Sequence, residues 1–467
     1  MYTSVQESFS ERKIPYTLFG LSFFAHLVVF LLLLSIYGPY SFFFSADGVL
    51  NGNDAQNYVT IAHNIAEGHG YSRFADAPFE PDAFRTPLLP LYFVPFVYFG
   101  GLQLIWLAML VMNLFLAFAP LVLYKLARMF LLHGYAVVAS LALALDPLFL
   151  YRTQLAEPDA LFVFLLLVAL YFCVVFWRTA NPRYFFISSL VLGVSILAKP
   201  TALYVAAIIF IFQAIFAILF RQAQWQRQIK YLVVGIAIIV ATLSPWLIRN
   251  HVLFGVWGLS SVGGFNLYEF YTVNEKMSDE QVSAAIEKSS REPSRYLPNQ
   301  KYFTGVAMNR IRHAPSMYAK EQAVGTFRNL FVSELPVIYY YGHGEILPFP
   351  YNPESKINLH ELLLRGDFVG AMSTAIRNVP KIAWSLVLLG LYCLAFLGWI
   401  VAWKKDRATF VSFTLFFVLF AYFVVASGPY VDAKYRMPAM PLIVIVALYG
   451  GMYLKEWWRN TLLFKVK

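Results

Sequence analysis

The sequence predicts an all-α protein that crosses a membrane about ten times, and three observations support this fold class. Of its 467 residues, 59% are hydrophobic and only 13% are charged, whereas soluble domains carry about 25% charged residues. The apolar residues form runs near the ~20 residues that a helix needs to cross a bilayer. The basic residues gather in alternate loops between these runs. Together these features exclude a soluble enzyme, a disordered chain and a disulfide scaffold.

Ten segments are apolar enough to span a membrane, although the fifth is short and closely followed by the sixth. They comprise residues 17–37, 102–124, 135–151, 160–177, 184–198, 201–220, 231–248, 382–403, 409–427 and 437–454. The first could be mistaken for a signal peptide, but its apolar run is too long and no cleavage motif closely follows it. We therefore expect it to be a retained anchor.

The distribution of basic residues orients the predicted bundle. One set of alternate loops and termini contains Arg12, Lys13, Lys125, Arg128, Arg178, Arg183, Arg221, Arg227, Lys230, Lys404, Lys405, Arg407, Lys455, Arg459, Lys465 and Lys467. This bias places both termini in the cytoplasm of a multi-pass inner-membrane protein. The formal charge of +10 is therefore mainly a topology signal, and we expect no nucleic-acid partner.

Three units follow from this topology. Residues 1–248 form an N-terminal membrane module whose first outer segment covers residues 40–100. Residues 249–381 form a larger outer segment, and residues 382–467 form a C-terminal membrane unit of three spans. We expect amphipathic helices at 278–292 and 304–331 in the larger outer segment.

A short helix is predicted in the first outer segment, where Asn53 and Gln56 resemble a capping box and Gly68 marks the end. Asp54 then lies in the first helical turn. It could simply complement the helix dipole, or it could take a proton from an acceptor hydroxyl or amine. Farther along, Pro87, Pro90 and Pro95 favour a short interfacial helix over a full span.

Basic residues on the outer side oppose the usual charge bias, so they need an explanation. They are Arg85, Arg152, Lys199, Arg249, Lys434 and Arg436. Individually they could cap helix ends or extend towards the interface. As a group from several outer loops, they favour binding of an anionic headgroup such as phosphate.

Two further carboxylates, Glu157 and Asp159, lie in an outer turn. They could pair locally with Arg152, or they could face Asp54 and position an acceptor or a metal. The sequence has no His or Cys spacing typical of a metal site. It assigns no cofactor and leaves open the participation of a divalent cation. Near His343, clustered tyrosines could anchor at the interface or stack on sugar rings.

Several short segments occur in an order that resembles the type C (GT-C) membrane glycosyltransferases that use polyprenyl-phosphate sugars. The closer resemblance is to bacterial enzymes similar to the lipid A aminoarabinose transferase and the protein O-mannosyltransferases. The segments are NDAQNY at 53–58, EGHGY at 67–71, FRTP at 84–87, AEP at 156–158, AKPT at 198–201, PWLIRN at 245–250, FG at 254–255, GFNLY at 264–268 and YRMP at 435–438.

This resemblance implies that Asp54 is the catalytic residue and that basic residues bind the donor phosphate. The implied phosphate-binding residues are Arg85, Lys199, Arg249 and Arg436. Separately from the resemblance, we expect Tyr58, Glu157, Asp159 and His343 to position the acceptor or a metal. The family usually has arginine where this chain has Lys199, which loses a bidentate grip on phosphate. Protein O-mannosyltransferases have glutamate after the catalytic aspartate, whereas Ala55 stands here.

The implied reaction moves a sugar from a polyprenyl-phosphate donor to a lipid, glycan or protein acceptor at the outer membrane face. The absence of a phosphate-cradling glycine loop in the sequence agrees with a lipid donor. One alternative is a transporter or flippase for lipid-linked sugars, and another is a membrane scaffold. A transporter would place charges near mid-span. Asp146 is the main charged residue in a predicted span, and we interpret it as part of a kink at Pro147.

Overall fold

The computed structural model describes residues 9–41, 54–271, 295–333 and 368–464, and within these ranges the regular structure is entirely helical. All ten predicted membrane segments fall on helices. Seven helical stretches are long and apolar enough to cross a membrane, and α6 and α9 are shorter apolar helices. The chain is therefore an all-α, multi-pass membrane protein, as the apolar runs predicted.

The helices in the first half of the chain are α1 Phe9–Ser41, α2 Asp54–Ala66, α3 Leu88–Gly100, α4 Ile105–Leu116, α5 Ala119–Ala127, α6 His133–Ala144, α7 Pro147–Arg152, α8 Asp159–Thr179, α9 Pro182–Ala198 and α10 Ala202–Phe220. The later helices are α11 Trp225–Phe254, α12 Val262–Tyr271, α14 Gln300–His313, α15 Pro315–Phe331, α18 Phe368–Lys405, α19 Arg407–Ala426 and α20 Met440–Phe464, with a short 3₁₀ turn, η6, at Ala433–Tyr435.

The third predicted span is divided into α6 and α7, and the reason is visible in the sequence. Pro147 cannot continue the hydrogen-bond ladder of α6. Asp146 caps the new helix because its Oδ1 accepts the backbone N–H of Leu148 at 2.8 Å. The interpretation of Asp146 as a kink residue is confirmed.

The outer segments also contain the short helices that the sequence indicated. Helix α2 ends just before Gly68, whose φ of 81° suits glycine. Helix α3 occupies the proline-rich stretch that we expected at the interface. The stretch expected at 304–331 instead forms two helices, α14 and α15, because Pro315 starts a new helix. Residues 278–292 lie outside the described residues.

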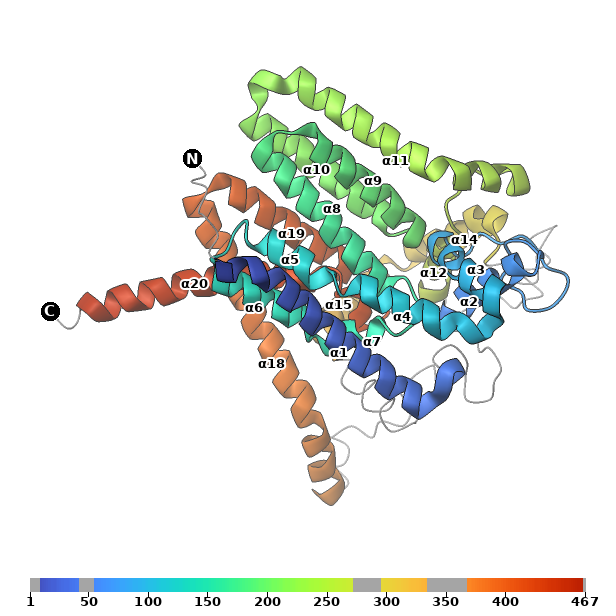
Figure 1. The fold of residues 1–467 in the computed structure, drawn as a ribbon, viewed down its shortest axis with the longest axis horizontal. Helices are drawn as coiled ribbons and strands as arrows, with labels where there is room; N and C mark the ends of the chain where they lie inside the picture. The colour runs from blue at the N-terminus through green and yellow to red at the C-terminus, as the bar shows by residue number, and fades with distance from the viewer. Residues whose placement is uncertain (1–8, 42–53, 272–294, 334–367, 465–467) are drawn as a thin grey trace.

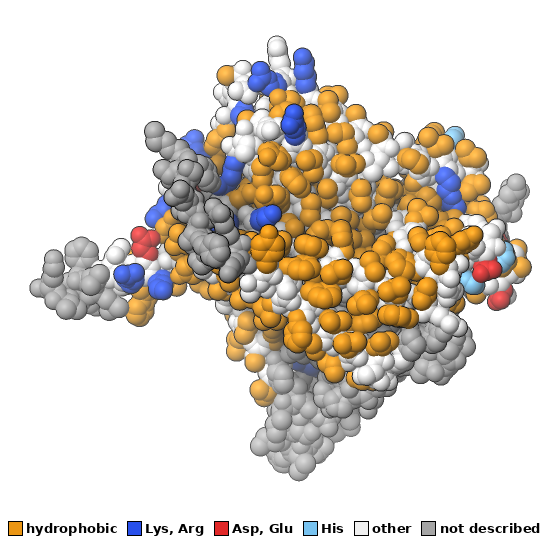
Figure 2. All heavy atoms as spheres, in the orientation of Figure 1, with side chains coloured by type: hydrophobic (Ala, Val, Ile, Leu, Met, Phe, Trp, Pro, Cys, Tyr) orange, Lys and Arg blue, Asp and Glu red, His pale blue; other side chains and the backbone are white. Residues whose placement is uncertain are grey.

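The helices separate into a long apolar bundle and a group of short helices at one end. In Figure 1, α8, α9, α10 and α11 run side by side, whereas α2, α3, α12 and α14 gather at the right-hand end. Hydrophobic side chains cover most of the face shown in Figure 2, and Lys and Arg side chains gather towards its upper and left margins. This separation gives the bundle one cation-rich end and one end that carries the outer helices.

Helices α18 and α20 approach each other closely at two glycines. A methyl group added at Gly398 would overlap the carbonyl oxygen of Val446, and one added at Gly450 would overlap that of Leu394. Small residues allow such backbone contact between helices in a membrane, where packing supplies much of the association energy. Gly451 is the neighbour of Gly450, but a methyl group there would meet no atom within 4 Å.

We therefore expect Gly450→Ala to destabilise the protein by about 1–3 kcal/mol, because the added methyl group overpacks the crossing of α18 and α20. Thermal unfolding of the purified protein in one detergent would measure the change. Gly451→Ala is the matched control and should unfold close to the wild-type temperature. Equal unfolding temperatures for the two variants would contradict the proposed importance of this crossing.

Candidate functional site

Asp54 starts α2 and faces Arg85, which is brought next to it from the loop before α3. Arg85 Nη2 donates to Asp54 Oδ1 at 2.5 Å. The two side chains differ in access, because that of Asp54 is 43% exposed and that of Arg85 only 10%. Asp54 can therefore be approached by another molecule while Arg85 supports it from the protein side.

Aromatic rings and the backbone hold Arg85 in place. Its guanidinium lies 4.5 Å from the ring centre of Phe84 and 5.3 Å from that of Tyr58. Its carbonyl oxygen accepts the hydroxyl of Tyr71 at 3.0 Å. Tyr58 is buried in α2, and in this structure it serves as part of the support for Arg85.

A buried ion pair shapes the loop that carries Arg85. Arg73 Nε donates to Asp82 Oδ1 at 3.0 Å, and Asp82 Oδ2 accepts the backbone N–H of Phe84 at 3.1 Å. Asn64 in α2 donates to the carbonyl oxygens of Ser72 and Phe74. The loop is thus fastened to the same helix that begins with Asp54.

Arg249 supports this loop from α11. Its Nη1 donates to the Asp82 carbonyl oxygen at 2.7 Å, and its guanidinium packs over the rings of Tyr71 and Trp246. The described contacts of Arg249 are with these groups, Asn250 and Phe254. Its predicted binding of donor phosphate stays a prediction.

A second ion pair joins the ends of two membrane helices. Asp159 is the first residue of α8, and Lys199 follows the last residue of α9. Lys199 Nζ donates to Asp159 Oδ1. Thr86, next to Arg85, donates to the carbonyl oxygen of Ala198 at 3.0 Å, which places the Arg85 loop beside this pair.

A third group of charges joins the turn before α8 to the last outer loop. Arg152 Nη1 donates to Glu157 Oε2 at 3.3 Å, and its Nη2 donates to both carboxylate oxygens of Asp432 at 3.1 and 3.2 Å. Lys434 follows in η6, with its Nζ 3.8 Å from Asp432 Oδ2. The local pairing of Glu157 with Arg152 is therefore present.

Arg436 instead binds the end of α15. This residue is 3% exposed, and its Nη1 donates to the carbonyl oxygen of Asn329 at 2.9 Å. Its Nη2 donates to the carbonyl oxygen of Val332. These contacts satisfy carbonyl groups that a helix end leaves without intrahelical partners. Phosphate binding by Arg436 stays a prediction.

Electrostatics connects the three groups of charges. Burial disfavours the ionised Asp54 carboxylate, but Arg85 and Lys434 outweigh this effect and lower its pKa. Burial also disfavours the charged Lys434 amine, but Glu157, Asp159 and Asp54 hold its pKa well above the usual value. Burial raises the pKa of Glu157 despite the nearby Lys434 and Arg152. Asp54, Glu157 and Asp159 thus all stabilise the charged form of Lys434.

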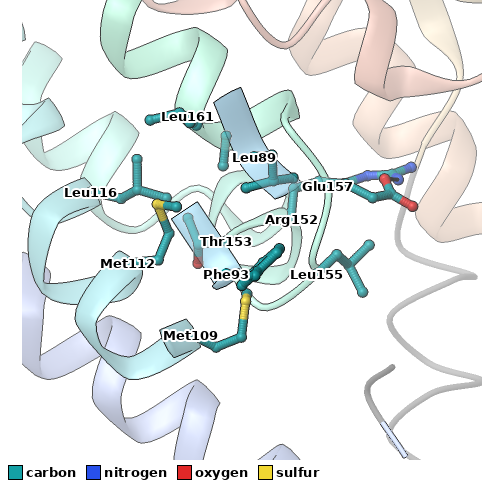
Figure 3. Close-up of a pocket in the computed structure, with 11 residues that line it drawn as sticks. Leu89, Phe93, Met109, Met112, Leu116, Arg152, Thr153, Leu155, Glu157 and Leu161 are labelled. Atoms are coloured by element: carbon teal, nitrogen blue, oxygen red, sulfur yellow. Dashed lines mark hydrogen bonds and ion pairs between the residues drawn. The ribbon is translucent and has the colours of Figure 1, made fainter. Parts of the chain in front are cut away.

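Beside this cluster lies a pocket with about 220 Å³ of empty space, part of it open to solvent. Its lining is mostly apolar and comes from α3, α4, α8 and the turn before α8. The apolar residues are Leu89, Phe93, Met109, Met112, Leu116, Leu155, Ala160 and Leu161. Figure 3 shows Arg152 and Glu157 side by side at one end of the pocket. The pocket therefore joins an apolar space to the charged cluster.

The structure brings together five of the predicted site residues: Asp54, Tyr58 and Arg85 in direct contact, and Asp159 with Lys199 beside them. Glu157 is coupled to them through its charge. His343 lies outside the described residues. Arg152 and Lys434 belong to the outer basic group that the sequence predicted to bind an anion, although the family resemblance assigned them no role. Asp432 was not singled out in the sequence.

Within the described part of the chain, no three His, Cys, Asp or Glu side chains are grouped closely enough to hold a metal ion. The cluster around Asp54 instead pairs carboxylates with cations. Such an arrangement can keep a carboxylate ionised near a bilayer and can attract an anionic group to its cations.

Comparisons with known proteins agree with this architecture. The family described as dolichyl-phosphate-mannose-protein mannosyltransferase matches residues 86–248. No curated protein sequence matches the chain.

The solved structures similar to this chain include the oligosaccharyltransferase of Archaeoglobus fulgidus. Its apo form aligns with a TM-score of 0.51 and 15% identity over 98% of this chain and 53% of that chain. Its complex with Zn and sulfate aligns with a TM-score of 0.50 and 15% identity, over 95% of this chain and 51% of that chain. ArnT of Cupriavidus metallidurans bound to undecaprenyl phosphate aligns with a TM-score of 0.40 and 16% identity. This alignment covers 92% of this chain and 76% of that chain.

This chain spans about half the length of the oligosaccharyltransferase that it resembles. The likeness covers nearly the whole of this chain and includes the membrane bundle with its outer helices. The family match covers the region between the Arg85 loop and the end of the seventh predicted span. The fold of this chain is therefore similar to that of the Archaeoglobus fulgidus oligosaccharyltransferase.

Proposed function

We infer that this protein is a glycosyltransferase that moves a sugar from a polyprenyl-phosphate donor to a lipid, glycan or protein acceptor. The observation that carries this inference is the half-exposed Asp54 carboxylate, paired with Arg85 beside further cations and an apolar pocket. The match to a family described by its dolichyl-phosphate-mannose donor supports a lipid-linked sugar. The reaction takes place at the outer face of the cytoplasmic membrane, with both termini inside.

The proposed reaction needs one base and one stabilised leaving group. Asp54 accepts the proton of an acceptor hydroxyl or amine, and the freed lone pair attacks the anomeric carbon. The bond between that carbon and the phosphate oxygen breaks, so its electrons leave with polyprenyl phosphate. The configuration at the anomeric carbon is inverted because attack and departure occur on opposite faces.

The charges around Asp54 suit both parts of this reaction. Arg85 keeps the carboxylate ionised, so that it can accept a proton. A phosphate monoester carries about −1.5 to −2 charges at pH 7, one step more negative than the diester donor. Nearby cations would stabilise that developing negative charge. Arg85 and Lys199, two of the predicted phosphate-binding residues, contact Asp54 and Asp159 and can supply such positive charge.

The apolar walls beside the cluster suit contact with the lipid part of the donor near its phosphate. The walls of the pocket are Leu, Met and Phe side chains, and its polar end is formed by Arg152 and Glu157. A polyprenyl chain lying against α3, α4 and α8 would leave its phosphate at that end. Glu157 and Asp159 would then be near enough to orient the acceptor.

Replacing Asp54 with Asn should lower kcat by about 10²- to 10⁴-fold, the usual contribution of a general base. Release of polyprenyl phosphate from a polyprenyl-phosphate sugar by the purified protein would measure the change. Glu67→Gln is the control, because Glu67 is an exposed carboxylate near the other end of α2. Unchanged turnover in Asp54→Asn would rule out this residue as the base.

Replacing Arg85 with Met should move the acid limb of the pH profile of kcat/KM to higher pH. Arg85 lowers the pKa of Asp54 by favouring its ionised form. Without Arg85 the pKa rises, so Asp54 becomes protonated, and inactive as a base, at a higher pH than in the wild type. Arg85→Lys should restore much of the wild-type profile. An acid limb at the same pH in Arg85→Met would contradict this electrostatic role.

Cysteine labelling should locate Glu67 outside and Lys404 inside. Cys173 is buried and Cys393 is exposed, so single-cysteine variants would be made in a Cys393→Ala background. A membrane-impermeant maleimide should label Glu67→Cys in intact cells and Lys404→Cys only after permeabilisation. The opposite pattern would overturn the proposed orientation and the outer-face site.

A further inference from the structure

The last outer loop, residues 427–436, is held in place by α15. Asn329 is fully buried and donates to Ser427 Oγ at 2.7 Å and to the carbonyl oxygen of Tyr430 at 2.9 Å. Its own Oδ1 accepts the backbone N–H of Asp432 at 3.0 Å. Together with the bonds from Arg436 to the end of α15, these contacts give Asp432 and Lys434 a defined position beside the Asp54 cluster.

The cluster contains four carboxylates, Asp54, Glu157, Asp159 and Asp432, and four cations, Arg85, Arg152, Lys199 and Lys434. Three of the cations donate hydrogen bonds to these carboxylates. Lys434 is different, because its ion pair with Asp432, at 3.8 Å, is longer than a hydrogen bond. An ammonium group has three N–H donors, so Lys434 retains capacity for an incoming anion.

Lys434 also lies where such an anion would arrive. Its side chain is 16% exposed, so it borders the site instead of facing open solvent. Its neighbour Asp432 is bonded to Arg152, and Arg152 lines the polar end of the apolar pocket. A phosphate attached to an apolar chain against the walls of this pocket would meet Arg152 first and Lys434 next to it.

We propose that Lys434, together with Arg152, binds the phosphate of the polyprenyl-phosphate donor and of its product, and that Asp432 competes with this phosphate for both cations. This assignment rests on the proposed function and adds residues that the motif comparison did not supply. Arg249 and Arg436, by contrast, are positioning residues that hold the neighbouring loops through backbone carbonyl groups.

Binding of undecaprenyl phosphate to the full-length protein in nanodiscs tests this proposal without requiring transfer. Lys434→Gln should raise the Kd about tenfold or more, because it removes a charge-assisted contact. Lys434→Arg should keep the Kd within about threefold of wild type, since it keeps the charge. Lys405→Gln, at the cytoplasmic end of α18, is the control for general loss of a lysine and should bind normally.

Asp432→Asn should change the Kd for undecaprenyl phosphate in the opposite direction to Lys434→Gln. Asparagine can still accept the Lys434 backbone N–H, which Asp432 Oδ1 accepts at 2.8 Å, but it no longer neutralises Arg152 and Lys434. This variant should bind undecaprenyl phosphate several-fold more tightly, which damage to the fold would not produce. A wild-type Kd for Lys434→Gln, or weaker binding by Asp432→Asn, would overturn the proposal.

Two further measurements distinguish a lipid-phosphate site from a free-phosphate site, and phosphate binding from sugar transfer. Inorganic phosphate at the same concentration should not displace undecaprenyl phosphate; displacement would show a free-phosphate site and overturn the lipid assignment. Asp54→Asn should bind undecaprenyl phosphate at least as tightly as the wild type while losing turnover. If the affinity changes occur but no sugar transfer is found, the proposed function fails and the Lys434 assignment stands. If transfer is found but Lys434→Gln binds normally, only the Lys434 assignment fails.

Discussion

The contact between Arg85 and Asp54 is the interaction on which the site depends. A carboxylate at the edge of a bilayer would lose solvation and tend to be neutral, but a guanidinium at 2.5 Å favours its charged form. Because Arg85 comes from a separate loop, the contacts that shape this loop also control the charge of Asp54. Three contacts hold this loop: the Arg73–Asp82 ion pair, the hydrogen bond from the Tyr71 hydroxyl and the hydrogen bond from Arg249.

Helix ends bring the other charges to the same place. Asp159 begins α8 and Lys199 ends α9, so each side chain complements the helix dipole at its own terminus. Their ion pair joins two adjacent membrane helices at one end of the bundle. Of these two helices, α8 also contributes to the wall of the apolar pocket.

The larger outer segment is connected to the cluster through α15. Asn329 fixes the loop that carries Asp432 and Lys434, and Arg436 binds the carbonyl groups at the end of the same helix. Asp432 in turn contacts Arg152. This chain of contacts gives the outer segment a direct physical link to the charges around Asp54, through bonds that a substitution in α15 would disturb.

The sequence by itself determined the membrane helices, because the length of an apolar run sets whether a helix can cross a bilayer. It also indicated the break at Pro147, whereas the break at Pro315 was not predicted, and Pro95 and Pro245 lie inside continuous helices. The position of Asp54 in the first turn of a short helix could also be predicted from the sequence, whereas its catalytic role was implied by the family resemblance. Apart from the local pair of Arg152 with Glu157, tertiary structure decided which cation pairs with which carboxylate. Arg152 and Asp432 lie 280 residues apart in the chain, and no local pattern specifies such a pairing. Folding also places Arg249 and Arg436 against backbone carbonyl groups, which no sequence pattern specified. It leaves Lys434 with a long ion pair to Asp432.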